Sequence, residues 1–166
     1  MTKIFAHENT EIGDSKITCA ELHMDDGACI SDYCTLRGKG SVYIGTYAQI
    51  EPYVALMTTV ASPMGHMSDM MKDESRRRTR TDDIIIEDHA FIGMHSTIMP
   101  GVVIGEGAVV GAYSYITQNV PAWTVSHQPK GKPKVSRRRI DDGVDIKPIT
   151  GVGFKRYRAN QDTEEL

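Results

Sequence analysis

Aliphatic residues recur at every sixth position through the second half of the chain. They begin at residue 86 and open consecutive six-residue units, IEDHAF, IGMHST, IMPGVV, IGEGAV, VGAYSY and ITQNVP. The fifth position of every unit is small or β-branched. A helix repeats every 3.6 residues and a half-buried strand every two, so neither accounts for this period. The pattern predicts an all-β solenoid in which each unit is one short strand plus a corner, and three units close a coil of about 18 residues.

The same frame continues upstream, although less regularly. Units IGTYAQ, IEPYVA and LMTTVA follow one another over residues 44–61, looser matches reach back to Ile12, and the phase shifts by two at Val42. We therefore expect N-terminal coils over residues 12–61 and regular coils over residues 84–121. At a strand spacing of about 4.8 Å, about five coils would make a rod of roughly 24 Å.

Two segments lack the repeat. Residues 62–83 are rich in Met, Arg and Asp, and we expect them to form an excursion loop between the two blocks of coils. A long loop on a regular scaffold is usually functional. Residues 122–166 follow Pro121 and contain further prolines and a basic run, which predicts a C-terminal extension that caps the rod or docks on a neighbour. All these parts belong to one domain, residues 1–166.

The composition is that of an ordinary globular domain, with 40% hydrophobic and 25% charged residues. No apolar run approaches the roughly 20 residues of a membrane span, and the first residues lack an apolar stretch of signal-peptide length. We therefore expect no membrane span and a cytoplasmic location. The three cysteines, an odd number, are expected to be free thiols, and no Cys or His pair stands at zinc-finger spacing beside them. No metal is predicted.

Positive charge is concentrated in two short stretches of an otherwise acidic chain, whose formal net charge is −3. Residues 72–80 contain five Lys or Arg, and residues 130–139 contain six. Such patches are compatible with solvated loops, and their size would also suit nucleic acid. Because aromatic residues do not interleave the basic ones and the remainder is acidic, a nucleic-acid partner is disfavoured. A small polyanionic ligand fits better.

The run from IIIEDHAFIG through MPGVVIGEGAVVGAYSYITQNVPAWTV resembles the hexapeptide-repeat acyltransferases over about 40 residues. The excursion loop with its Gly65-His66 pair is similar in position to the loops of galactoside, maltose, xenobiotic and nucleotide-sugar acetyltransferases. The resemblance implies a left-handed parallel β-helix and a homotrimer. It also implies that acetyl-coenzyme A lies in a cleft between adjacent subunits, with the acceptor at the loop end.

The chemistry implied by this family needs a base that takes a proton from an acceptor amine or hydroxyl near pH 7. His66 is the only histidine of the excursion loop, and imidazole has the suitable ordinary pKa. His66 is therefore the expected catalytic base. His95 is expected to face outward on a coil wall and is the alternative base if the loop alignment slips. His89 occupies a corner where tolerance of a left-handed conformation explains its presence.

The coenzyme is expected to contact the regular coils and the basic run. The resemblance places Ala112 and Thr117 beside the pantetheine arm. Slim residues and backbone N–H groups around the coil corners could bring the coenzyme close and bind the oxyanion formed from the thioester. These corner residues are Gly93, Met94, Gly111 and Ala112. Corner geometry alone would also explain the glycines.

Charged side chains complete the expected site. Lys130, Lys132 and Lys134 are candidates for the coenzyme phosphates, although a solvated tail would have the same composition. Asp32 is the candidate for binding sugar hydroxyls or the amine of the acceptor.

These expectations define an acetyl-coenzyme A dependent acetyltransferase that acts on a sugar or nucleotide-linked sugar in surface polysaccharide biosynthesis, with N- and O-acetylation both open. Two other classes stay open. A γ-type carbonic anhydrase shares such coils but needs three zinc-binding histidines, and no H-x4-H pair occurs here. A non-catalytic binding or structural β-helix is permitted if the loop is inert.

Overall fold

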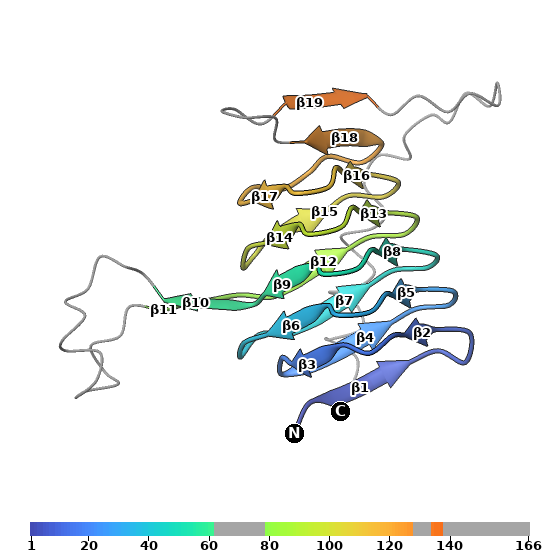
Figure 1. Ribbon diagram of the computed structural model, residues 1–166, viewed down its shortest axis with the longest axis vertical. Coiled ribbons are helices and arrows are strands. Elements are labelled where there is room, and N and C mark those ends of the chain that lie inside the picture. Colours follow the sequence, from blue (N-terminus) through green and yellow to red (C-terminus); the bar gives the residue numbers. More distant parts are fainter. Residues whose placement is uncertain (62–78, 128–133, 138–166) are drawn as a thin grey trace, which may run out of the picture.

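The computed structural model describes residues 1–61, residues 79–127 and the backbone of residues 134–137. The described residues contain no helix; they form strands of two to four residues that wind into a rod of stacked coils (Figure 1). Each coil contributes one strand to each of three walls, and the strands of a wall pair in parallel. Five coils are complete and a further strand begins a sixth. The expected left-handed parallel β-helix is confirmed.

The three walls are named in the order in which the chain passes through them. Wall A contains β1 (Lys3–Ala6), β4 (Glu21–Met24), β7 (Val42–Ile44), β12 (Ile84–Ile86) and β15 (Val103–Ile104). Wall B contains β2 (Glu11–Ile12), β5 (Cys29–Ile30), β8 (Gln49–Ile50), β13 (Phe91–Ile92), β16 (Val109–Val110) and β18 (Thr124–His127). Wall C contains β3 (Lys16–Thr18), β6 (Thr35–Arg37), β9 (Ala55–Met57), β14 (Thr97–Ile98) and β17 (Tyr115–Ile116). The bends between walls are called the A–B, B–C and C–A corners.

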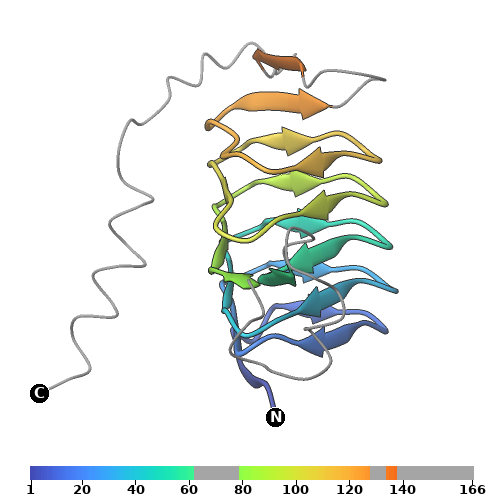
Figure 2. The same ribbon diagram turned by 90° about the vertical axis from the view of Figure 1, so that its left-hand side faces the viewer.

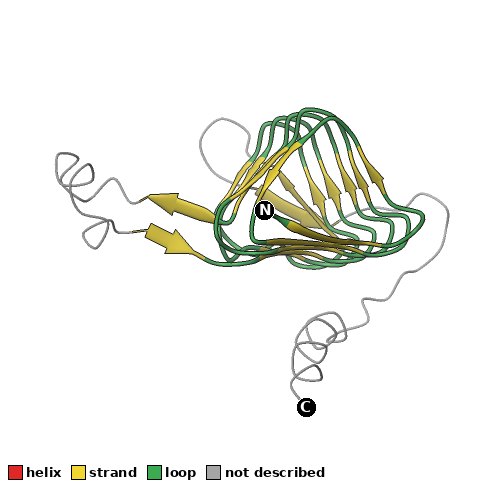
Figure 3. Ribbon diagram, turned by 90° about the horizontal axis from the view of Figure 1, so that it is seen from below, coloured by secondary structure: helices red, strands yellow, loops and turns green. Residues whose placement is uncertain are grey.

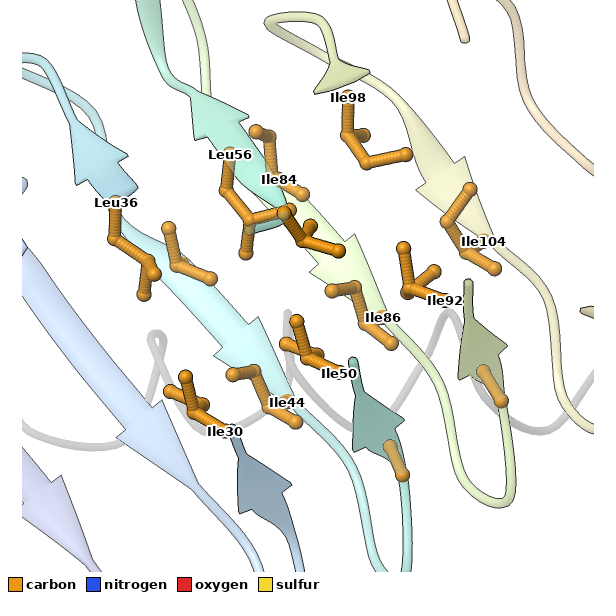
Figure 4. Close-up of a cluster of buried hydrophobic side chains, with 14 of the residues drawn as sticks. Ile30, Leu36, Ile44, Ile50, Leu56, Ile84, Ile86, Ile92, Ile98 and Ile104 are labelled. Carbon is orange, nitrogen blue, oxygen red and sulfur yellow. The ribbon is translucent and has the colours of Figure 1, made fainter. Parts of the chain in front are cut away.

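The six-residue period produces the core directly. An aliphatic residue every sixth position falls once on each wall, so it stacks on its counterparts in the coils above and below (Figure 4). On wall A, Ile86 pairs with Ile44 below and Ile104 above, and all three are fully buried. Burying each such side chain contributes about 1.5–3 kcal/mol. The repeat that identifies the fold is therefore also the main source of its stability.

Extra residues are absorbed at the C–A corner. Leu22 pairs with Val42, which is 20 positions later, whereas Ile86 and Ile104 are separated by the regular 18. The two additional residues lie in the bend between β6 and β7, where Gly38 has a φ of +136°. This bend accounts for the phase shift seen in the sequence.

The excursion leaves the rod at the same corner one coil later. Strand β10 (Thr59–Ala61) follows β9 almost directly, and it pairs antiparallel with β11 (Thr79–Thr81), which leads back into β12. Viewed along the rod, this pair projects away from one corner of the triangle (Figure 3). Ile44 and Ile86 are partners despite a separation of 42 positions. The excursion thus interrupts the chain without disturbing the register of the rod.

The two ends of the rod differ. The first coil begins at Lys3, ahead of residue 12, and its inward-facing Ile4 and Ile12 remain 49% and 38% exposed. At the other end β19 (Lys134–Arg137) pairs antiparallel with β18, so the chain turns back on itself along wall B (Figure 2). Part of the basic extension therefore covers an edge of the last coil.

The three cysteines are free, as expected. Cys19 and Cys34 are buried in the lower coils, and burial raises the pKa of both thiols. These thiols will therefore be slow nucleophiles near neutral pH.

Candidate functional site

Within the described part of the chain, seven residues other than glycine adopt a left-handed backbone conformation, and all seven carry rings. They are Tyr33, Tyr47, Tyr53, His89, His95, Tyr113 and Trp123, with φ between 54° and 63°. Such a conformation costs a bulky residue about 1–2 kcal/mol. Stacked ring pairs, each worth about 0.5–1.5 kcal/mol beyond the area they bury, offset much of it. The left-handed conformation expected for His89 is confirmed.

Four of these rings form a continuous column along the B–C corner, which we call the aromatic edge. Tyr33 stacks on Tyr53 with centroids 5.1 Å apart, Tyr53 on His95 at 4.7 Å, and His95 on Tyr113 at 4.9 Å. These spacings match the distance between coils, so each ring lies directly above the last. The placement of His95 on a wall was wrong, because its backbone forms the corner itself.

Five of the expected ligand contacts gather beside the aromatic edge. Gly93 and Met94 lead into the corner of the fourth coil, Gly111 and Ala112 into that of the fifth, and Asp32 into that of the second. Met94, Ala112 and Asp32 are exposed. Thr117 follows β17 and lies at the next corner, so the structure separates it from the others.

The glycines of this corner are explained by the packing of coils. A Cβ built on Gly93 would lie 2.5 Å from the Ala112 backbone nitrogen, and one built on Gly111 would lie 2.9 Å from the His127 Cβ. The N–H groups of Gly93 and Gly111 donate to Val110 and Ser126 carbonyls at 2.8 Å each. Among the described residues, no backbone carbonyl accepts a hydrogen bond from the N–H groups of Met94 and Ala112, the other two residues expected near the oxyanion.

Charge differs between the two ends of the aromatic edge. The lower corners carry Asp14, Asp32 and Glu51, and the Asp32 carboxylate accepts a hydrogen bond from the Asp14 N–H at 2.8 Å. Residues 91–98 and 109–120, which form the upper part of walls B and C, contain no Asp or Glu. An anionic ligand is therefore favoured at the upper end.

The excursion is anchored by a compact set of hydrogen bonds. The Asp83 carboxylate accepts the Ser41 N–H at 2.7 Å, and the Asp83 carbonyl accepts the Gly101 N–H at 3.1 Å. The hydroxyls of Thr59 and Thr81 lie 2.9 Å apart across the β10–β11 pair. Sequence reasoning missed these residues, and the Asp-Asp pair immediately before the III run was the only signal for them. They fix the base of the loop that carries the expected catalytic residue.

Several expected residues cannot be placed. His66, Lys130 and Lys132 lie outside the described residues, and for Lys134 only the backbone, opposite His127, is described. Their roles stay predictions.

The A–B corner holds a separate acidic group. Burial raises the pKa of Glu87, helped by the negative charges of Glu106 and Asp88, although the Glu106 N–H donates to the Glu87 carboxylate at 2.8 Å. His89 belongs to this corner, where its ring stacks on Tyr47 at 5.8 Å. His89 is therefore remote from the aromatic edge.

Two features are absent from the described part of the chain. No three His, Cys, Asp or Glu side chains there come close enough to hold a metal ion. Within the same residues, no helix is long and apolar enough to cross a membrane.

Comparison with known proteins adds to this geometry. Residues 83–118 match the family model described as bacterial transferase hexapeptide (six repeats). This part of the chain is therefore a hexapeptide-repeat region of that family. One relative of this hexapeptide-repeat protein is the dTDP-4-amino-4,6-dideoxy-D-glucose acyltransferase of Escherichia coli, 30% identical over 119 residues. That match covers 71% of this chain and 62% of the relative, so the chain spans about three fifths of the relative's length.

Two solved structures share the fold of this hexapeptide-repeat protein. The maltose O-acetyltransferase from Clostridium difficile 630 superposes with a TM-score of 0.67 at 20% identity, over 84% of this chain and 71% of that one. AntD, an N-acyltransferase from Bacillus cereus in complex with dTDP and 3-hydroxybutyryl-CoA, gives a TM-score of 0.55 at 21% identity, over 84% and 82%.

Proposed function

We propose that this protein transfers an acetyl group from acetyl-coenzyme A to an amine or hydroxyl of a sugar or nucleotide-linked sugar. The observation that carries the proposal is the anchoring of the excursion on the hexapeptide-repeat rod by the hydrogen bonds at its base. The sequence of this excursion contains one histidine. The named relatives support it, because they are acyltransferases of sugars and of a nucleotide-linked amino sugar. The proposed location is the cytoplasm, and surface polysaccharide is the proposed destination of the product.

His66 is the proposed general base. Its imidazole takes the proton from the acceptor nitrogen or oxygen as that atom attacks the thioester carbonyl carbon. The C–S bond then breaks, the acetyl group stays on the acceptor, and the coenzyme leaves as a thiol with the proton that His66 returns. The N–H groups of Met94 and Ala112 are the proposed donors to the oxyanion. Thr117 is proposed beside the pantetheine arm, and Asp32 as a contact of the acceptor.

The test is His66→Ala, measured by release of coenzyme thiol with a panel of amino sugars and nucleotide sugars. Turnover should fall about 10²–10⁴-fold while acetyl-coenzyme A affinity is unchanged. His89→Ala, at the remote A–B corner, is the control, and His95→Ala tests the alternative base. If His95→Ala abolishes turnover and His66→Ala stays within a few-fold of the wild type, the base lies on the aromatic edge and the assignment of His66 is wrong. Absence of thiol release with every acceptor would favour a non-catalytic rod.

The basic extension is the proposed site for the coenzyme phosphates. Neutralising Lys130, Lys132 and Lys134 together should weaken coenzyme A binding, and the loss should shrink for dephospho-coenzyme A and at high salt. If mutant and wild type bind both ligands with equal affinity, these lysines do not contact the coenzyme and belong to a solvated tail.

The proposed assembly is a homotrimer, in which the coenzyme lies between neighbouring rods. Light scattering tests it directly, because the single chain has a mass of 18.4 kDa. A monomer at micromolar concentration would end the shared-site proposal.

A further inference from the structure

The aromatic edge ends abruptly at its upper end. Tyr113 is 69% exposed, more than the other two tyrosines of the column, although one of its faces stacks on His95 with an angle of 13° between the rings. His95 and Tyr53 each have a ring on both sides. Among the described residues Tyr113 has only one such partner.

Above Tyr113, the described coils end on wall B. Strand β18 lies above β16 on wall B, and His127 is reached just above the Gly111 corner. The chain then reverses, because β19 pairs antiparallel with β18 and places Lys134 opposite His127. Within the described residues, no further ring follows Tyr113 along the B–C corner. The described part of the column therefore ends at Tyr113.

The geometry of Tyr113 suits a planar ligand. Its backbone is left-handed, with a φ of 58°, and only one stacked pair offsets that strain, whereas His95 has two. A planar ring placed one coil spacing further on would extend the column at the favourable centroid distance of about 4.5–7 Å. The ring of His95 supports Tyr113 from below and holds its orientation before any ligand arrives.

The charges around the column select one of its two ends. Tyr33, at the lower end, is 58% exposed and also has one stacking partner, but Asp14 and Asp32 stand beside it. Those carboxylates would repel the phosphates of a nucleotide. Residues 109–120 around Tyr113 carry no carboxylate. A nucleobase attached to phosphates is thus favoured only at Tyr113.

We propose that Tyr113 is the stacking platform for the nucleobase of a nucleotide substrate. This inference rests on the proposed function, in which two such bases exist: the adenine of the coenzyme and the base of a nucleotide-linked sugar. Both share the planar ring and the anionic tail. The two sources are separated by the choice of probe.

The experiment measures binding by calorimetry with two probes that carry no thioester, adenosine 3′,5′-bisphosphate and dTDP. Tyr113→Asn removes the ring, and asparagine tolerates the left-handed backbone. We expect it to weaken binding of one probe about 5- to 100-fold, as loss of a base-stacking ring does elsewhere. Tyr113→Phe keeps the face and should stay within about two-fold of the wild type. Tyr33→Asn, at the same corner with the same backbone conformation, is the matched control and should change neither probe.

The pattern of losses shows which nucleobase, if either, stacks on Tyr113. A loss confined to adenosine 3′,5′-bisphosphate assigns the platform to the coenzyme, and a loss confined to dTDP assigns it to the nucleotide-linked sugar. Unchanged binding of both probes in Tyr113→Asn, or an equal loss in Tyr33→Asn, overturns the proposal. Thermal unfolding of each variant shows that the rod is intact. Because neither probe can be turned over, failure here leaves the His66 test of acetyl transfer unaffected.

Discussion

The carboxylate of Asp83 accepts a hydrogen bond from the backbone N–H of Ser41 at 2.7 Å, across 42 positions of the sequence. Ser41 lies in the enlarged bend before β7, and Asp83 directly precedes β12. The carbonyl of the same aspartate accepts the Gly101 N–H from the coil above. One residue therefore joins three successive coils at the point where the excursion rejoins the rod.

Asp83→Ala should destabilise the protein and misplace the excursion. Leaving the half-buried Ser41 N–H without its acceptor should lower the free energy of unfolding by about 1–3 kcal/mol, measured by urea denaturation. Asp83→Asn keeps an acceptor oxygen and should recover most of the loss. If the two variants are equally destabilised, charge rather than the hydrogen bond is what matters at this position.

Ile86→Ala should lower the free energy of unfolding by about 2–5 kcal/mol, because the side chain is fully buried between two isoleucines of wall A. Its neighbour Ile85 points outward and is only half-buried. Ile85→Ala is therefore the matched control, and it should lower the free energy of unfolding clearly less in the same denaturation experiment. Similar losses at both positions would contradict the assignment of inward and outward faces.

Gly93→Ala tests whether the glycines of the B–C corner serve packing or ligand approach. The new methyl group would collide with the Ala112 backbone, so the free energy of unfolding should fall by about 1–3 kcal/mol. Gly111→Ala meets mainly the Cβ of His127 and should be milder. Should Gly93→Ala keep full stability and lose only coenzyme affinity, the glycine would belong to the ligand site instead.

Glu87→Gln should stabilise the protein at neutral pH. The folded pKa of Glu87 is raised, so the folded state binds its proton more tightly than the unfolded state, and stability falls as pH rises from the ordinary value of 4.5 through the folded pKa. Gln removes that loss and can still accept the Glu106 N–H. The gain should be under about 1 kcal/mol, because water screens a half-exposed carboxylate. Thermal unfolding at pH 7.5 and at pH 4 checks it, and a gain that persists at pH 4 would contradict the assignment.

The repetitive part of the fold could be predicted because its determinants are local. The period of six places Ile86 and Ile92 on successive walls regardless of what surrounds them, and the structure has both fully buried. The strand at Lys3–Ala6 was missed, because the residues between it and Ile12 break the six-residue spacing. Its place is set by pairing with β4.

The candidate site depends on contacts that a single pass along the chain does not show. Sterics disfavour a left-handed tyrosine, so Tyr53 and Tyr113 gave no corner signal; they are tolerated because each stacks on His95 from an adjacent coil. For the same reason His95 was placed on a wall. The Asp83–Ser41 bond is similarly remote, since it joins two bends that meet only after the coils have stacked.

The pairing of Ile44 with Ile86 means that the segment between them can be replaced without changing how the coils stack. The rod keeps one register whether 18 or 42 positions separate partners, so the length of the inserted segment is nearly independent of coil stacking. Each doubling of a closed loop costs only about 0.6 kcal/mol in chain entropy. A different segment grafted between Thr59 and Thr81 should therefore leave both the stacking of the coils and the aromatic edge intact.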